Sequence, residues 1–173
     1  MFTAYIGLGA NLGDPPQQLQ RALTLLATVC EVQAVSPVYR SAPMGPADQP
    51  DYANAVCVLK TARAPEDLMR ALLGIEQQMG RVRALHWGPR LIDLDLLHVD
   101  GQRCQSALLT LPHPGIAQRN FVLQPLLDLA PNLLIEGVGD LRAALARVGT
   151  AGLQRWDDQG ARASSPDSIT WPT

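Results

Sequence analysis

Lysine is almost absent from this sequence of 173 residues: Lys60 is the one lysine among 14 basic residues, and the others are arginines. The formal net charge is −2, which argues against general affinity for nucleic acid or for an anionic membrane. Arginine presents a planar fork of donors that suits bidentate contact with phosphate, although a genome-wide bias toward arginine codons would give the same composition. The positions of the arginines must therefore decide between these two explanations.

Cysteine and long apolar runs are scarce as well. Cys30, Cys57 and Cys104 are odd in number, lie far apart and form no CxxC pair, so the sequence predicts neither a disulfide framework nor a zinc site. No apolar run approaches the roughly 20 residues of a membrane span, and the N-terminal stretch MFTAYIGLGANLGD lacks a basic segment ahead of its short apolar part. We therefore expect a cytoplasmic protein that binds neither membranes nor nucleic acid.

The domain organisation follows from length and composition. A hydrophobic content of 47% at this length favours one compact domain, which we place over residues 1–156. Residues 157–173, DDQGARASSPDSITWPT, are polar and aperiodic, which predicts a disordered tail.

Hydrophobic periodicity places the regular elements, because strands alternate apolar and polar residues whereas helices repeat apolar residues every three or four positions. The patterns predict four strands and two helices: strands at residues 3–9, 30–40, 52–59 and 91–99, and helices that begin after Asp14 and at Pro65. The order β-α-β-β-α-β is typical of a ferredoxin-like α+β sandwich, in which an antiparallel sheet carries both helices on one face and leaves the other open. A hairpin turn at 100–103 and helices at 122–130 and 140–148 should follow.

Two carboxylates stand two positions apart in the last of these strands, RLIDLDLLHVD. Alternation places Asp93 and Asp95 on the open face and turns Leu94 toward the helices. The two aspartate Cα atoms are then roughly 7 Å apart, so both carboxylates can converge on a hard cation such as Mg²⁺, which completes its shell with substrate phosphates and water. A D-x-D pattern by itself is a weak signal, because solvation or pairing with arginine would also explain it.

A cationic loop precedes this strand. Arg81, Arg83 and Arg90 lie within ten residues that also contain His86 and no acidic residue, and such a loop is suited to phosphate.

Aromatic residues supply a second set of candidates. Tyr52 and Asn54 share one face of a predicted strand, where they would offer a flat ring and a paired donor and acceptor to a heterocycle. Phe121 is one of two phenylalanines. Core packing would explain each ring taken alone.

Five segments, in order, carry a specific resemblance: YIGLGANLGD, VYRSAPMGPADQPDYANAV, IEQQMGRVR, WGPRLIDLDLL and LPHPGIAQRNFVLQPLLDLAP. Over residues 5–131 the chain resembles the 6-hydroxymethyl-7,8-dihydropterin pyrophosphokinase family of the folate pathway. The resemblance implies a ferredoxin-like fold and transfer of a pyrophosphoryl group from ATP to the 6-hydroxymethyl oxygen of the pterin, with release of AMP. It also implies two Mg²⁺ ions. We expect a monomer whose partners are its two small-molecule substrates.

The resemblance also implies roles for individual residues. Asp93 and Asp95 resemble the metal ligands, and with Arg81 and Arg90 they form the catalytic set. The residues that resemble the pterin site are Ser41, Pro43, Met44, Tyr52, Asn54, Trp87 and Phe121. Those that resemble the ATP site are Glu76, Arg83, Trp87, Arg90, Leu96, Thr110, His113 and Arg119. Gly9 and Asn11 are expected to form a turn near the site.

Three positions depart from the pattern of the family. Ala10 replaces a frequent serine, which predicts the loss of one local hydrogen bond, and Leu73 replaces a glutamine that contacts ATP in some members. His86 stands where an arginine occurs.

Two other function classes remain open. An RNA-binding module on this fold would need an exposed aromatic RNP pattern, which is absent. A non-catalytic small-molecule sensor would have no metal to bind at the aspartates. Metal-dependent turnover would separate the enzyme from the sensor.

Overall fold

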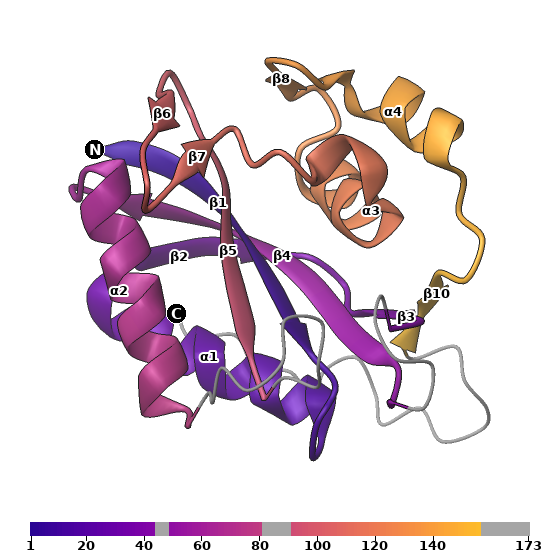
Figure 1. Ribbon diagram of the computed structural model, residues 1–173, viewed down its shortest axis with the longest axis horizontal. Coiled ribbons are helices and arrows are strands. Elements are labelled where there is room, and N and C mark those ends of the chain that lie inside the picture. The colour runs from indigo at the N-terminus through magenta and orange to yellow at the C-terminus, as the bar shows by residue number, and fades with distance from the viewer. Residues whose placement is uncertain (44–48, 81–90, 157–173) are drawn as a thin grey trace.

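The computed structural model describes residues 1–43, 49–80 and 91–156. Its centre is a six-stranded antiparallel sheet in the order β10-β3-β4-β1-β5, with β2 also paired to β4 (Figure 1). The strands of this sheet are β1 (Phe2–Ala10), β2 (Glu31–Val35), β3 (Tyr39–Ser41), β4 (Tyr52–Thr61), β5 (Asp93–Val99) and β10 (Gln154–Arg155).

Helices α1 (Pro15–Val29) and α2 (Pro65–Gln78) pack on one face of the sheet, as the ferredoxin-like prediction requires. Both begin where proline supplies a fixed φ at the first helical positions. At the start of α1 the Asp14 carboxylate accepts the Gln17 N–H at 3.4 Å, which confirms the predicted cap. Alternate residues of β1, including Ile6 and Leu8, meet the apolar faces of both helices in the larger core. The ferredoxin-like α+β fold is therefore confirmed.

The single strand predicted at residues 30–40 is wrong, because this stretch is divided into β2 and β3. Both strands pair with β4, but Pro37 between them has no N–H to donate to the ladder. Ser36 bridges the gap: its N–H donates to the Val56 carbonyl, and its hydroxyl accepts the Val56 N–H, both at 2.9 Å. The strand is interrupted, but β4 keeps a partner at this point.

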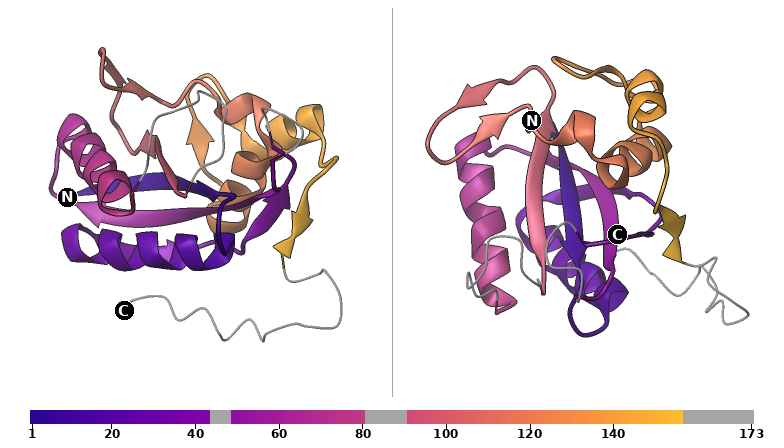
Figure 2. Two further views of the ribbon diagram at one scale, coloured as in Figure 1. Left: turned by 60° about the horizontal axis from the view of Figure 1, so that its bottom comes forward. Right: turned by 45° about the vertical axis from the view of Figure 1, so that its right-hand side comes forward.

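The second face of the sheet is not open along its whole length, contrary to the expectation from sequence. Helices α3 (Asn120–Leu129) and α4 (Leu141–Val148) pack on it with the short 3-10 helix η1 (Ile116–Gln118), and Figure 2 (left) shows α1 beneath the sheet and α3 and α4 above it. Tyr5, Val56 and Leu97 project from the sheet into this second core. The predicted helices at 122–130 and 140–148 thus exist, and their apolar sides cover part of the face that was expected to be bare.

A β-bulge in β5 interrupts the alternation of its side chains after Leu97. The β1–β5 register shifts between Tyr5 and Ile6, so Leu97 is an extra residue on β5. Leu97 joins the second core, and the His98 ring lies 5.7 Å from the Tyr5 ring. The bulge comes after the two aspartates, so their predicted alternation is undisturbed.

Beyond β5 the chain turns at Gly101, where φ is 72°, but this turn does not close a hairpin with β5 as predicted. The hairpin instead joins β6 (Cys104–Gln105) to β7 (Thr110–Leu111), and a second small pair joins β8 (Leu134–Ile135) to β9 (Gly139–Asp140). Within the described residues no helix is both long and apolar enough to cross a membrane. The predicted tail, residues 157–173, lies outside the described residues.

Candidate active site

Two glycines of β1 form the floor of the site. Gly9 lies between Asp93 of β5 and Asn54 of β4, and Gly7 lies beside Asp95. Because Gly9 has no side chain, Asp93 and Asn54 face one another across bare backbone, whereas the Leu97 side chain lies over Gly7, 3.5 Å from where a Cβ would stand. A Cβ at Gly9 would stand 3.6 Å from Oδ1 of Asn54. Gly9 therefore lies inside a strand and leaves space for a ligand, and the sequence-based expectation of a turn at this residue is wrong.

Asp93 and Asp95 lie on the same face of β5, two positions apart and opposite the glycines. β5 is an edge strand, and Glu76 at the end of α2 approaches its outer side. The Glu76 side chain is 2% exposed, and its Oε2 accepts the Leu94 N–H at 3.0 Å. Edge strands otherwise leave such N–H groups unpaired. The predicted ATP residue Glu76 thus fixes the backbone between the two aspartates.

The donor set of β5 suits a hard cation. In the part of the chain that the structure describes, no three His, Cys, Asp or Glu side chains gather into a complete metal site. Mg²⁺ nevertheless usually takes only one or two carboxylate ligands from a protein, and water and substrate phosphates occupy its other coordination positions.

Asn54 forms the centre of the opposite wall. Its side chain is 5% exposed, and Nδ2 donates to Oγ of Ser41 at 2.7 Å and to the Tyr39 carbonyl at 3.4 Å. Ser41 is in turn the cross-strand partner of Tyr52. Three predicted pterin residues, Ser41, Tyr52 and Asn54, are therefore brought together, with the Asn54 amide held so that its oxygen turns toward Gly9.

Asn11 anchors the segment that leads back into β4, a larger role than the turn expected from the sequence. It is 1% exposed, and its Nδ2 donates to Oε1 of Gln49 at 2.9 Å and to the Pro50 carbonyl at 3.0 Å. The same segment contains Pro43, a predicted pterin contact. A buried asparagine directly after a strand was the signal that could have revealed this anchor.

The turn after β7 brings His113 against β5. The His113 N–H donates to the Leu97 carbonyl at 2.8 Å, and its ring Nδ1 accepts the Gly115 N–H at 3.0 Å. Since Nδ1 accepts, the neutral ring carries its proton on Nε2. Burial, and then the positive charge of Arg119, lower the pKa of His113 below its ordinary value, against a smaller raising effect of Asp93. At pH 7 His113 is a neutral Nε2–H donor.

Arg119 lies between η1 and α3 and packs against Gly115. A Cβ at Gly115 would stand 2.8 Å from Cζ and Nε of the Arg119 guanidinium, so the glycine makes room for this side chain. The guanidinium carbon also lies 6.0 Å from the centre of the Phe121 ring. The predicted nucleotide residues His113 and Arg119 are thus neighbours of the predicted pterin residue Phe121.

Leu96 and Thr110 occupy different settings from the other predicted ATP residues. The Leu96 side chain is 1% exposed in the core beneath the sheet, so a contact with a nucleotide would have to use its backbone. Thr110 is exposed on β7. Ala10 is fully buried in the same core as Leu96, so this departure from the family alters the core and not the face of the site.

Five of the predicted site residues fall where the structure gives no description. Met44, Arg81, Arg83, Trp87 and Arg90 lie outside the described residues, and their roles stay predictions.

A contact that no sequence pattern indicates joins the second helix layer to the site. Tyr39 is 7% exposed, and its hydroxyl donates to the Asp128 carboxylate on α3. The other Asp128 oxygen accepts from Gln124 at 3.1 Å. Because Asn54 donates to the Tyr39 carbonyl, this contact fixes α3 relative to the Asn54 wall. Tyr39 and Asp128 are 89 residues apart, too far for any local pattern to connect them.

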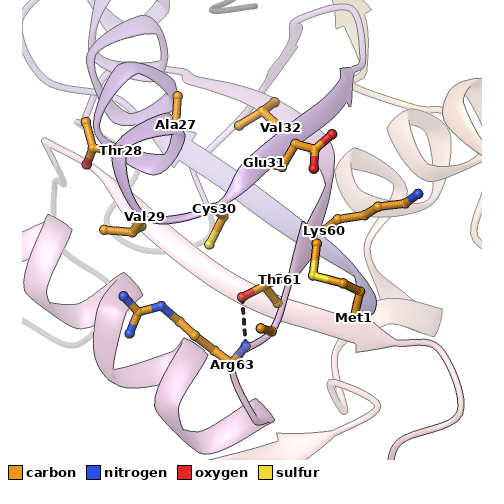
Figure 3. A pocket seen from close by; sticks show the side chains of 11 residues that line it. Met1, Ala27, Thr28, Val29, Cys30, Glu31, Val32, Lys60, Thr61 and Arg63 are labelled. Atoms are coloured by element: carbon orange, nitrogen blue, oxygen red, sulfur yellow. Dashed lines mark hydrogen bonds between the residues drawn. The ribbon is translucent and has the colours of Figure 1, made fainter.

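A hollow of about 780 Å³ lies at the other end of the sheet and is lined by Met1 and residues 27–32 and 60–63 (Figure 3). Its position follows from the register, in which Thr61 pairs with Phe2 while the floor glycine Gly9 is seven residues further along β1. Seven residues of strand span roughly 23 Å. The hollow shares no residue with the site.

The chain matches the model of the 7,8-dihydro-6-hydroxymethylpterin-pyrophosphokinase (HPPK) family over residues 5–131. It is similar to the 2-amino-4-hydroxy-6-hydroxymethyldihydropteridine pyrophosphokinase of Pseudomonas aeruginosa, with 45% identity over 153 residues that cover 87% of this chain and 94% of that protein. Its identity to the protein of the same name from Methylorubrum extorquens is 40% over 157 residues, which cover 90% of this chain and 99% of that protein.

In three dimensions the chain resembles the HPPK-DHPS protein of Plasmodium falciparum, with a TM-score of 0.69. The match covers 90% of this chain and 47% of that chain at 14% identity, so it supports the fold alone. The sequence matches carry the family, because they span most of this chain and nearly the whole length of its two bacterial relatives. The chain therefore belongs to the 7,8-dihydro-6-hydroxymethylpterin-pyrophosphokinase family and transfers a pyrophosphoryl group from ATP to hydroxymethyldihydropterin in folate biosynthesis.

Proposed function

We propose that the transfer depends on Mg²⁺ and that Asp93 and Asp95 would hold two ions at the site. The observation that carries this proposal is the glycine floor at Gly9, where Asp93 and Asn54 lie on one face with only backbone between them and Asp95 lies on the same face of β5. Two Mg²⁺ ions bound there would neutralise phosphate charge and align the attacking and leaving oxygens.

In this reaction the hydroxymethyl oxygen of the pterin forms a bond to the β-phosphorus of ATP. The bond from that phosphorus to the oxygen shared with the α-phosphorus breaks, and AMP leaves. Glu76 contributes by holding β5 at the Leu94 N–H, so that the carboxylates keep their spacing. Carboxylates held in place in this way need no rearrangement during the reaction.

The nucleotide side of the site is supplied by the turn after β7. His113 offers Nε2–H to a phosphate oxygen without adding charge, and Arg119 offers a planar cationic fork. On the pattern of the family we also assign ATP contacts to Arg83, Trp87, Arg90, Thr110 and the backbone of Leu96, and we assign Arg81 and Arg90 to the transferring phosphoryl group.

The pterin side is supplied by β3 and β4. We propose that the heterocycle stacks between Tyr52 and Phe121, that Trp87 is a further pterin contact on the pattern of the family, and that Asn54 reads the edge of the heterocycle. The hydrogen bond from Asn54 to Ser41 supports this role, because it holds the amide oxygen toward the floor. The backbone around Pro43 and Met44 would read the remaining polar edge.

We also propose that the enzyme acts as a monomer in the cytoplasm. The large hydrophobic side chains exposed in the described segments are Met1, Leu134 and Val148, which are far apart in the sequence, and single exposed apolar residues are normal on a monomer. All three cysteines are free, as is usual in a reducing compartment.

The test is to incubate the purified protein with ATP, 6-hydroxymethyl-7,8-dihydropterin and MgCl₂ and to resolve the nucleotides by chromatography. We expect AMP and a diphosphorylated pterin in equal amounts, no turnover after chelation with EDTA, and recovery when MgCl₂ is restored. ADP as the product would contradict the assigned transfer, and full turnover in EDTA would contradict the metal assignment.

A further inference from the structure

The last described residues form an extra edge of the sheet beside the pterin wall. Gln154 and Arg155 of β10 pair with Arg40 and Tyr39 of β3, and the Trp156 N–H donates to the Val38 carbonyl at 2.9 Å (Figure 1). This segment lies outside residues 5–131, over which the family model matches. β3 is three residues long, so much of its hold on the sheet comes from its two neighbours, β4 and β10.

The Trp156 side chain also contacts β3, in addition to this backbone pairing. The Arg40 guanidinium carbon lies 3.8 Å from the centre of the Trp156 ring, within the range of a cation–π contact. Nη1 of the same arginine lies 3.7 Å from Oδ2 of Asp51. The Nε atom of Arg40 is buried and has no hydrogen-bond partner in the described part of the chain. Arg40 is therefore held by an aromatic ring on one side and by one carboxylate on the other.

This stack spans the base of the segment that joins β3 to β4. Arg40 directly precedes Ser41, and Asp51 directly precedes Tyr52, and these two following residues are cross-strand partners. Because side chains alternate along a strand, Arg40 lies on the face opposite Ser41, behind the pterin wall. Trp156 accordingly packs against the core beneath the sheet.

We propose that Trp156 is a positioning residue for pterin binding, because it holds Arg40 and Asp51 together behind the strands that carry the pterin residues. This inference rests on the proposed assignment of Ser41 and Tyr52 to the pterin. Loss of the ring frees the Arg40 side chain, weakens its contact with Asp51 and loosens the base of the segment that contains Pro43. Among the described residues, the nucleotide side on β5 is separated from β3 by β4 and β1, so we expect it to be left unchanged.

The experiment compares Trp156→Ala with Trp156→Phe and with Trp171→Ala, a matched tryptophan change outside the described residues. KM for the pterin and KM for ATP are measured separately, each at saturating co-substrate. We expect Trp156→Ala to raise the pterin KM about tenfold, while Trp156→Phe, which keeps a ring beneath the guanidinium, stays within about threefold of wild type. The ATP KM should not change in any of the three variants, and Trp171→Ala should match wild type.

Arg40→Met provides a second route if Trp156→Ala does not fold, since it removes the charge that contacts both Trp156 and Asp51 while keeping an unbranched side chain. It should raise the pterin KM to the same extent, and the double variant should show no further increase. An unchanged pterin KM in the folded variants, or an equal rise in both KM values, overturns the proposal.

The variant Asn54→Ala distinguishes failure of the positioning role of Trp156 from failure of the pterin-site assignment. If Asn54→Ala also leaves the pterin KM unchanged, the wall itself has been assigned wrongly. If it raises the pterin KM while Trp156→Ala and Arg40→Met do not, the wall stands and the positioning role is refuted.

Discussion

On the β5 side of the glycine floor, the polar side chains stand on the edge strand of the sheet, whereas on the β3 and β4 side they are buried and hydrogen-bonded to one another. Asp93 and Asp95 are part-exposed and carry like charges, and the bond from Leu94 to Glu76 secures their backbone. Asn54, by contrast, is 5% exposed and bonded to Ser41 at 2.7 Å.

The two sides of the site differ in how much their polar side chains contribute to folding and to ligand binding. Part-exposed charges on an edge strand favour ligand binding and contribute little to folding, since water also solvates them. A buried, hydrogen-bonded amide contributes to both, since breaking its bond leaves a buried polar group without a partner. Substitutions on the two sides should therefore affect activity and stability in different proportions.

The largest effect is expected from Asp95→Asn. It should reduce turnover at least about 100-fold, because a charged ligand of the Mg²⁺ that would neutralise the reacting phosphates is lost. The free energy of unfolding should stay within about 0.5 kcal/mol of wild type, because the Asp95 side chain is part-exposed. Initial rates at saturating Mg²⁺ and urea unfolding measure the two quantities.

Asp67→Asn is a matched control for this change. Asp67 is an exposed carboxylate on α2 that pairs with Arg70 at 3.0 Å, away from the site. It should leave turnover unchanged. Near-wild-type turnover in folded Asp95→Asn would contradict the separation of the two sides.

The next largest effect is expected from Asn54→Ala, which should weaken both folding and pterin binding. The lost bond leaves the Ser41 hydroxyl buried without its partner, which should lower the free energy of unfolding by about 1–3 kcal/mol. The pterin KM should rise about tenfold, the equivalent of one lost hydrogen bond of ordinary strength. Ser41→Ala should reproduce part of the stability loss. A variant as stable as wild type would show that Asn54 serves the ligand alone.

The β5 side of the site could be predicted from the sequence more fully than the β3 and β4 side. The aspartates follow from strand alternation, which depends only on neighbouring residues, and the bulge that would disturb it comes later, at Leu97. The helix face follows for the same reason, since the stripes of α1 and α2 repeat locally. Spacing also placed Tyr52 and Asn54 on one strand face and Arg81, Arg83 and Arg90 in one cationic loop, and resemblance to the family supplied the remaining pterin and ATP residues.

The features that the sequence did not reveal depend on residues far apart in the chain. Nothing near Tyr39 indicates a contact with Asp128, 89 residues later, and nothing in the pattern of residues 140–148 shows that α4 covers the second face. The split between β2 and β3 was readable from Pro37, and the stretch was predicted as one strand because its apolar pattern outweighed one missing N–H. Local rules therefore predicted the elements, and tertiary packing decided which faces they cover.

A smaller effect, on the nucleotide side, is expected from Gly115→Ala. Gly115 has φ −88°, which alanine adopts without strain, so folding should be unaffected. The new Cβ would stand 2.8 Å from the Arg119 guanidinium and must displace it, so the ATP KM should rise about fivefold while the pterin KM stays constant. In an Arg119→Ala background the same change should have no effect.

Gly74→Ala on α2 is the control for Gly115→Ala. A Cβ there meets nothing within 4 Å, and alanine in place of glycine inside a helix should raise stability by up to about 1 kcal/mol without changing either KM. An ATP KM that rises equally in both alanine variants would show that the effect is general and does not depend on Arg119.

The smallest effect concerns the sheet beneath the pterin wall, and it is a difference in thiol labelling. Cys57 lies on β4 on the face opposite Asn54, is fully buried, and burial raises its pKa to about 12. Burial also raises the pKa of Cys30, though that thiol is part-exposed.

If the pterin side is as rigid as its buried hydrogen bonds indicate, iodoacetamide should label the part-exposed Cys104 and Cys30 in the native protein at pH 8. It should label Cys57 only after unfolding in urea. Mass spectrometry of the digested protein gives the order. Native labelling of Cys57 at the rate of Cys104 would mean that β4 opens locally, and the contrast between a rigid pterin side and an edge-strand metal side would then be lost. Asn54→Ala should move the result in that direction, because it removes the bond that ties β4 to β3 at this point.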